Sequence, residues 1–152
     1  MNKDMKLRKF ITTTIREFLN ESINNHALTP EYYLDDFYAV DFNEDDYNEE
    51  QALREIQKVI DYVLSLKYPI KVYRGINTIV PTKNYGDGSW SEKLEVAESF
   101  GDKIYVGIIP NKNIVDIEQT IRTRVMNEFE YEIYVPNFND VKIIDTYEKK
   151  RG

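Results

Sequence analysis

The period of the hydrophobic pattern changes at Pro69, and this change constrains the fold more than any other feature of the sequence. Before Pro69, apolar residues recur at three-then-four spacing, which is typical of helices with one buried face. After Pro69, short apolar runs are broken by turn residues, which is typical of strands. Helices that precede strands predict an α+β domain rather than a regular alternation of strand and helix.

Two helices and one irregular stretch are expected before Pro69. The spacing predicts an amphipathic helix over residues 4–24 and a second one over residues 49–66. Asn48 is a suitable N-cap for the second helix, because two glutamates follow it in the first turn. Residues 29–48 are acidic and aromatic and lack a clean period, so we expect a loop region there, with room for a short turn of helix.

The second half of the chain predicts several strands and one short helix. A strand over residues 70–74 is expected to stop at Gly75, and a helix over residues 91–100 is expected to stop at Gly101. Further strands are expected at residues 103–110, 129–135 and 141–144, with another short one suggested at 114–117. We interpret residues 1–152 as one domain, in which a helical front (1–67) precedes a strand-rich core (68–152).

Composition excludes several classes of function. The chain has no cysteine and one histidine, His26, so a thiolate zinc site or a histidine-based triad is nearly ruled out and no metal is expected. We assign His26 a capping or surface role. No apolar run approaches the roughly 20 residues of a membrane span, and the N-terminus lacks the apolar region of a secretory signal, so we expect a cytoplasmic protein without membrane contact. A net charge of −7 without a dense Lys/Arg cluster counts against nucleic acid as a partner.

Three short patterns in the second half carry candidate chemistry, although each has an ordinary structural explanation. An arginine at a strand end is usually solvated, a Ser-Trp-Ser sequence before a helix is usually a cap with a packed aromatic, and alternating glutamates usually form the polar side of an edge strand. The edge-strand explanation has a difficulty, because three like charges on one strand face repel each other unless a cation neutralises them. The patterns are Val72-Tyr73-Arg74-Gly75, Gly88-Ser89-Trp90-Ser91, and Glu130-Tyr131-Glu132-Ile133-Tyr134-Val135-Pro136, with Glu128 as the third charge.

In this order, the three patterns resemble the signature of the arginine–serine–glutamate class of mono-ADP-ribosyltransferases, in the compact form of phage-encoded or intracellular bacterial members. The resemblance covers roughly residues 70–145 and departs from the family in two ways: a short interval over residues 77–88, and Trp90 in place of the family's usual threonine. The family's aromatic-Arg-Gly strand matches Tyr73-Arg74-Gly75, its Ser-x-Ser motif and following helix match Ser89-Trp90-Ser91 with Ala97 and Phe100, and its Glu-x-Glu matches Glu130-Tyr131-Glu132.

The resemblance implies split antiparallel sheets around a cleft for NAD, which is the substrate, with helices at the N-terminal side. Glu132 would stabilise the positive charge that develops on the ribose, and Ser89 would orient Glu132 or the ribose. Arg74 would bind the pyrophosphate, and Gly75 would let the nicotinamide carboxamide approach the backbone. Tyr73 and Ser91 complete the expected cofactor site. Glu130 would bind the acceptor and accept its proton, which favours a protein arginine as the target.

Several alternatives stay open at the level of sequence. Residues 118–129 would form the acceptor-recognition loop of the family, and their Arg122 and Arg124 are cofactor contacts, self-modification sites, or solvated arginines on a surface helix. The acidic stretch 35–50 lacks the features of a calcium loop, so it is a solvated loop or a partner-docking surface. Candidate aromatics that stack on NAD are Tyr73, Tyr85 and Phe129.

The acceptor is an unknown host protein in the leading hypothesis, in the host cytoplasm if the chain is phage-encoded. An NAD glycohydrolase, or an enzyme that modifies a nucleic acid or nucleotide, is the second hypothesis. A non-enzymatic acidic interaction protein is the third.

Overall fold

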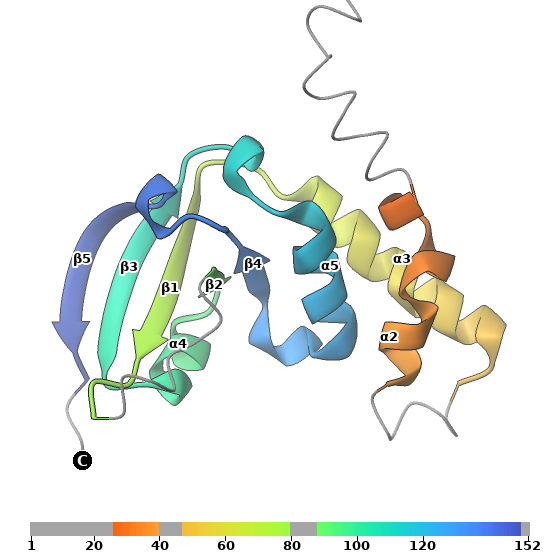
Figure 1. The fold of residues 1–152 in the computed structure, drawn as a ribbon, viewed down its shortest axis with the longest axis horizontal. Helices are drawn as coiled ribbons and strands as arrows, with labels where there is room; N and C mark the ends of the chain where they lie inside the picture. The colour runs from red at the N-terminus through yellow and green to blue at the C-terminus, as the bar shows by residue number, and fades with distance from the viewer. Residues whose placement is uncertain (1–25, 40–46, 80–87, 150–152) are drawn as a thin grey trace, which may run out of the picture.

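The computed structural model describes residues 26–39, 47–79 and 88–149. Within these ranges the chain forms four α-helices and one five-stranded antiparallel sheet, in the strand order β4-β2-β1-β3-β5 (Figure 1). The helices are α2 (Leu34–Tyr38), α3 (Glu49–Ser65), α4 (Leu94–Phe100) and α5 (Ile117–Met126). The strands are β1 (Ile70–Ile76), β2 (Ser89–Ser91), β3 (Lys103–Ile109), β4 (Glu132–Tyr134) and β5 (Lys142–Glu148), and short 3₁₀ turns are η1 (His26–Leu28), η2 (Pro30–Tyr33), η5 (Lys112–Ile114), η6 (Glu128–Glu130) and η7 (Phe138–Asp140).

The predicted α+β class is confirmed, whereas the sheet arrangement differs from the expectation. All five described strands belong to a single sheet, instead of the two separate sheets that the resemblance implied. The predicted helix over residues 4–24 lies outside the described residues. The stretch after residue 29 contains more helix than expected, since η2 and α2 follow one another there.

Helix α3 confirms the second predicted helix together with its cap. The side chain of Asn48 accepts a hydrogen bond from the Gln51 amide at 2.8 Å, and the Gln51 side chain accepts one from the Asn48 amide at 3.1 Å. This reciprocal pair satisfies two of the amides that a helix start leaves without partners. The buried face of α3 packs against η2, α2 and α5; its residues are Ala52, Ile56, Ile60 and Val63. Leu64, which the apolar stripe predicted to be buried, is 53% exposed.

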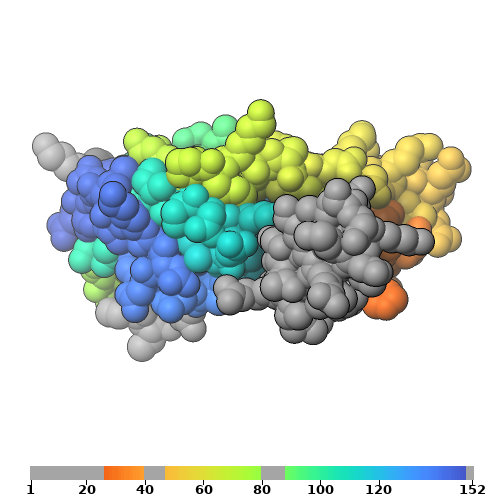
Figure 2. Space-filling view, turned by 90° about the horizontal axis from the view of Figure 1, so that it is seen from above, coloured from red at the N-terminus to blue at the C-terminus, as the bar shows by residue number. Residues whose placement is uncertain are grey.

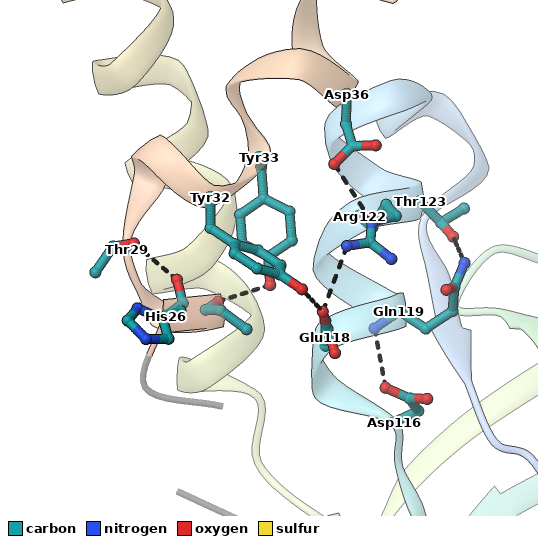
Figure 3. A network of polar contacts seen from close by, with 11 residues as sticks. His26, Thr29, Tyr32, Tyr33, Asp36, Asp116, Glu118, Gln119, Arg122 and Thr123 are labelled. Carbon is teal, nitrogen blue, oxygen red and sulfur yellow. Dashed lines mark hydrogen bonds and ion pairs between the residues drawn. The ribbon is translucent and has the colours of Figure 1, made fainter. Parts of the chain in front are cut away.

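Polar contacts fix η2 and α2 against α5 (Figure 3). The Tyr32 hydroxyl donates to Glu118, and Arg122 pairs with both Glu118 and Asp36 at 3.3 Å. Beneath these contacts Tyr33 is fully buried, and its hydroxyl donates to the carbonyl of Ala27 at 2.6 Å. The helical front is therefore joined to the second half of the chain through α5.

Helix α5 in turn is fixed to strand β4, because the buried hydroxyl of Thr120 forms hydrogen bonds with both elements. The Thr120 hydroxyl donates to the Asp116 carbonyl at 2.7 Å and accepts the amide of Tyr134 at 2.9 Å. The Asp116 side chain caps the helix by accepting from the Gln119 amide at 2.9 Å. The short strand suggested at residues 114–117 is thus wrong: Asp116 is a helix cap, and a helix rather than a strand begins at Ile117.

Strand β1 is the centre of the sheet, and it packs closely against α4. The predicted stop at Gly75 is wrong, since β1 continues to Ile76. A Cβ atom built on Gly75 would lie 1.7 Å from the carbonyl oxygen of Ala97 in α4. Glycine at this position allows the strand and the helix to touch through their backbones.

The two faces of the sheet have separate cores. One face packs under α4 around Ala97, Ile104 and Val106. The other packs under η5 and η7; its buried residues are Val72, Trp90, Ile109, Val115, Ile133, Val135 and Val141.

The described part of the molecule is elongated, with the sheet at one end and α2 and α3 at the other (Figures 1 and 2). Helix α5 lies between β4 and α3 and connects the two ends. In the described ranges, no helix has the length and apolar character that a membrane crossing requires.

Candidate active site

A cavity of about 220 Å³ lies between α4 and the sheet, and it brings the three sequence patterns together. Residues from β1, from β2, from the Glu-x-Glu segment and from α4 all line it, although Tyr73 and Glu132 are 59 positions apart in the chain. The lining residues are Tyr73, Arg74, Gly75, Ser89, Trp90, Ser91, Val96, Ala97, Phe100, Glu130 and Glu132. The residues of the three patterns that were assigned to catalysis or to the cofactor site are all in this set, whereas Phe129, a candidate for stacking on NAD, is not.

The register of the sheet places one residue of each pattern side by side. Tyr73 pairs with Ser91 across β1 and β2, and Ser91 pairs with Glu132 across β2 and β4. Paired residues project from the same face of an antiparallel sheet, so these three form a row. Ser89 lies on the same face, two residues before Ser91. Trp90 alternates to the opposite face, where it is 1% exposed and stacks on Phe138.

The segment that carries both glutamates is not the continuous strand expected over residues 129–135. Glu130 ends η6, Tyr131 adopts a left-handed conformation (φ 48°, ψ 44°), and β4 begins only at Glu132. The expected reason for Glu130 and Glu132 to share a face, alternation along a strand, is therefore wrong. Both side chains still line the cavity, because the left-handed residue between them turns the backbone. A tyrosine in this conformation is uncommon, and such residues concentrate at functional sites.

Three consecutive carbonyl groups of this turn are each held by a hydrogen bond. The carbonyl of Glu130 accepts the Ser91 hydroxyl at 2.7 Å, and that of Tyr131 accepts the Glu92 amide at 3.1 Å. The carbonyl of Glu132 accepts Nε of Arg124 at 2.6 Å. The hydroxyl of Ser91 also accepts the Lys93 amide at 3.0 Å, so Ser91 shapes the site rather than offering a free hydroxyl.

The two carboxylates are in different environments. Glu132 is 6% exposed, and its Oε2 is buried without a hydrogen-bond partner among the described residues. Buried acceptors are nearly always satisfied, so this oxygen is a candidate to accept a hydrogen bond from a bound ligand. Burial, and secondly the charge of Glu132, raise the pKa of the Glu130 carboxyl above its ordinary value. A raised pKa makes Glu130 a stronger base than an ordinary glutamate.

Arg74 borders the cavity but does not belong to the row of Tyr73, Ser91 and Glu132. It pairs with Tyr105, and its guanidinium carbon lies 5.9 Å from the ring centroid of Phe138, on the Trp90 side of the sheet. The side chain is 8% exposed. Contact of Arg74 with a pyrophosphate stays a prediction.

Gly75 has a structural explanation besides access of the nicotinamide to its backbone. A Cβ atom built on Gly75 would meet the backbone of Ala97 and would lie 3.2 Å from the amide nitrogen of Gly101. Close packing of α4 therefore accounts for the glycine, and the approach of a carboxamide to its backbone stays a prediction.

Sequence reasoning missed the most buried charged group near the site. Arg124, which we had considered as a cofactor contact, a modification site or a solvated arginine, is 5% exposed and lies behind Glu132. Its neighbour Arg122 is half-buried and paired with Asp36 and Glu118, remote from the cavity lining. The signal in the sequence was the spacing of Arg124 with Thr120 and Ile121, which places it on the buried side of α5.

The candidate aromatics differ in position. Tyr73 lines the cavity, Phe129 is 70% exposed outside it, and Tyr85 lies outside the described residues. His26 forms part of η1, where the carbonyl of His26 accepts the Thr29 hydroxyl at 2.7 Å.

Comparisons of the chain with protein-family models, with curated proteins and with solved structures find no match.

Proposed function

We propose that this protein is an NAD-dependent mono-ADP-ribosyltransferase that transfers ADP-ribose to a protein acceptor, with arginine favoured. The observation that carries the proposal is the convergence of the Arg, Ser and Glu patterns on one cavity, with a buried glutamate oxygen that has no donor among the described residues. Cavities that enclose a whole drug-sized ligand measure roughly 300–1,000 Å³. At about 220 Å³ the cavity suits the nicotinamide and its ribose rather than the entire dinucleotide.

Glu132 is the proposed catalytic residue. Cleavage breaks the bond between C1′ of the ribose and the nicotinamide nitrogen, whose electron pair leaves with the neutral nicotinamide. A buried carboxylate beside C1′ stabilises the positive charge that develops on the sugar, and its second oxygen can accept a ribose hydroxyl. The unsatisfied Oε2 of Glu132 supports this role, because a ribose hydroxyl would supply the donor that the described residues do not.

Glu130 is the proposed acceptor-binding residue. A new bond forms between C1′ and a nitrogen of the acceptor guanidinium, and that nitrogen must lose one proton. The raised pKa of Glu130 brings its basicity closer to neutral pH, which favours proton uptake from the acceptor. Since its carboxylate also carries the opposite charge, it attracts a guanidinium before the reaction.

The proposal is tested by incubating the protein with NAD labelled in the adenylate portion and a cell lysate. Wild type is compared with Glu132→Gln and with Glu128→Gln, a matched control because Glu128 is exposed on the same segment and is absent from the cavity lining. Label on protein from the wild type and the control, but not from Glu132→Gln, supports the proposal. Free ADP-ribose without labelled macromolecules indicates a glycohydrolase, and labelled nucleic acid indicates the other enzymatic alternative. Intact NAD with folded wild-type protein refutes all three.

A further inference from the structure

A buried ion pair lies directly behind the Glu-x-Glu turn. Nη2 of Arg124 and Oε2 of Glu92 are 2.6 Å apart, and their side chains are 5% and 17% exposed. The Tyr62 ring covers the guanidinium at 5.0 Å, and the Tyr62 hydroxyl lies 3.2 Å and 3.3 Å from the two oxygens of Glu92. These three residues come from α3, from α5 and from the loop between β2 and α4, so the pair joins the helical front to the site.

The ion pair is also connected to the backbone of the turn at two points. Nε of Arg124 donates to the carbonyl of Glu132, and the amide of Glu92 donates to the carbonyl of Tyr131. The planar guanidinium thus uses two of its donors in a fork, one toward Glu92 and one toward Glu132. The contacts form a closed ring through Arg124, Glu132, Tyr131 and Glu92.

We propose that Arg124, anchored by Glu92, is a positioning residue that keeps Tyr131 left-handed and thereby aims both carboxylates into the cavity. The left-handed state of a tyrosine is unfavourable by itself and persists only where the surroundings determine it. Here the surroundings are the hydrogen bonds to the carbonyls of Glu130, Tyr131 and Glu132. Of these three bonds, the one from Arg124 comes from helix α5. The expected loss of rate rests on the proposed function, whereas the expected change in the backbone of Tyr131 does not.

A merely structural ion pair is the alternative, and a double variant separates the two. Loss of one buried partner destabilises a protein because the other charge is left alone, whereas replacement of both is often nearly neutral. Arg124→Met combined with Glu92→Gln removes both charges, and the glutamine can still accept the Tyr62 hydroxyl. If the pair only stabilises the fold, this double variant recovers wild-type activity. If Arg124 positions the turn, the double variant folds but stays slow.

The experiment measures the kcat and KM of nicotinamide release, together with the thermal midpoint. Because a misplacement of about 1 Å can reduce a rate roughly 100-fold, we expect the double variant to lose about 100-fold in kcat with KM changed less than about 3-fold. Arg124→Lys keeps the charge but not the fork, so it should recover only part of the rate. Arg122→Met, on the same helix but paired with Asp36 and Glu118, is the matched control and should retain the wild-type rate.

Wild-type kcat in the folded double variant overturns the inference. A wild-type protein that releases no nicotinamide refutes the proposed function instead, and the crystal structure of the double variant then tests the inference without any activity. The inference expects Tyr131 to leave the left-handed region and the Glu130 carboxylate to withdraw from the cavity. An unchanged turn in that structure overturns it.

Discussion

Replacement of Gly75 by alanine distinguishes the two explanations for this glycine. The added Cβ would lie 1.7 Å from the Ala97 carbonyl oxygen, about 1.6 Å closer than a short carbon–oxygen contact of roughly 3.3 Å. The atom it meets belongs to the backbone of α4, so no rotamer change relieves the contact and the helix itself must move. None of the described glycines has a positive φ, so the clash is the reason for the effect rather than backbone strain.

Overpacking destabilises proteins by about 1–3 kcal/mol and occasionally more. Because a helix backbone rather than a side chain must shift, we place Gly75→Ala at about 3 kcal/mol. For a domain of this size, that corresponds to a fall of roughly 6–12 °C in the thermal midpoint. Circular dichroism melts measure it, with Gly107→Ala as a comparison, because its Cβ would meet the side chains of Val141 at 2.5 Å and Trp90 at 3.2 Å rather than a backbone. A Gly75→Ala protein that melts within about 2 °C of wild type but binds NAD more weakly would refute the packing explanation and favour carboxamide access.

Two further predictions concern the cap of α3 and the acceptor glutamate. Asn48→Ala removes the capping pair with Gln51 and should lower the free energy of unfolding by about 1 kcal/mol, as measured by urea denaturation; an unchanged midpoint would contradict the capping role. Glu130→Gln should abolish transfer to an arginine acceptor while nicotinamide release continues, and equal loss of both would contradict a role specific to the acceptor. Because the pKa of Glu130 is raised and its ionised form is the base, the transfer rate should increase as pH rises through that pKa. Transfer rates measured in buffers that span the acidic range test this. The same rise of the rate with pH in any residual transfer by Glu130→Gln would contradict it.

The sequence predicted those elements whose local signals agree with their tertiary environment. The cap at Asn48 and the apolar stripe of α3 specify the same helix. The apolar runs of β1 and β3 specify strands by their own sequence, and both strands are central in the sheet. The three patterns, which the resemblance assigned to one site, line the same cavity.

The elements that sequence reasoning missed depend on contacts between distant segments. Tyr131 has no local preference for the left-handed region, so the turn between the glutamates follows from bonds to Ser91, Glu92 and Arg124. The burial of Arg124 was not predicted, because a charged side chain is rarely buried without a partner, and its partner Glu92 lies 32 positions away. The end of β1 was placed too early, because glycine signals a break unless another backbone packs against it.

The central claim is that this cavity cleaves NAD through Glu132, and nicotinamide release by the purified protein tests it most directly. We predict release by the wild type and by Glu128→Gln, and a roughly 100- to 1,000-fold slower release by a folded Glu132→Gln protein, the range found when one preorganised electrostatic group is removed. Equal rates for wild type and Glu132→Gln, or no release by folded wild type, would contradict it.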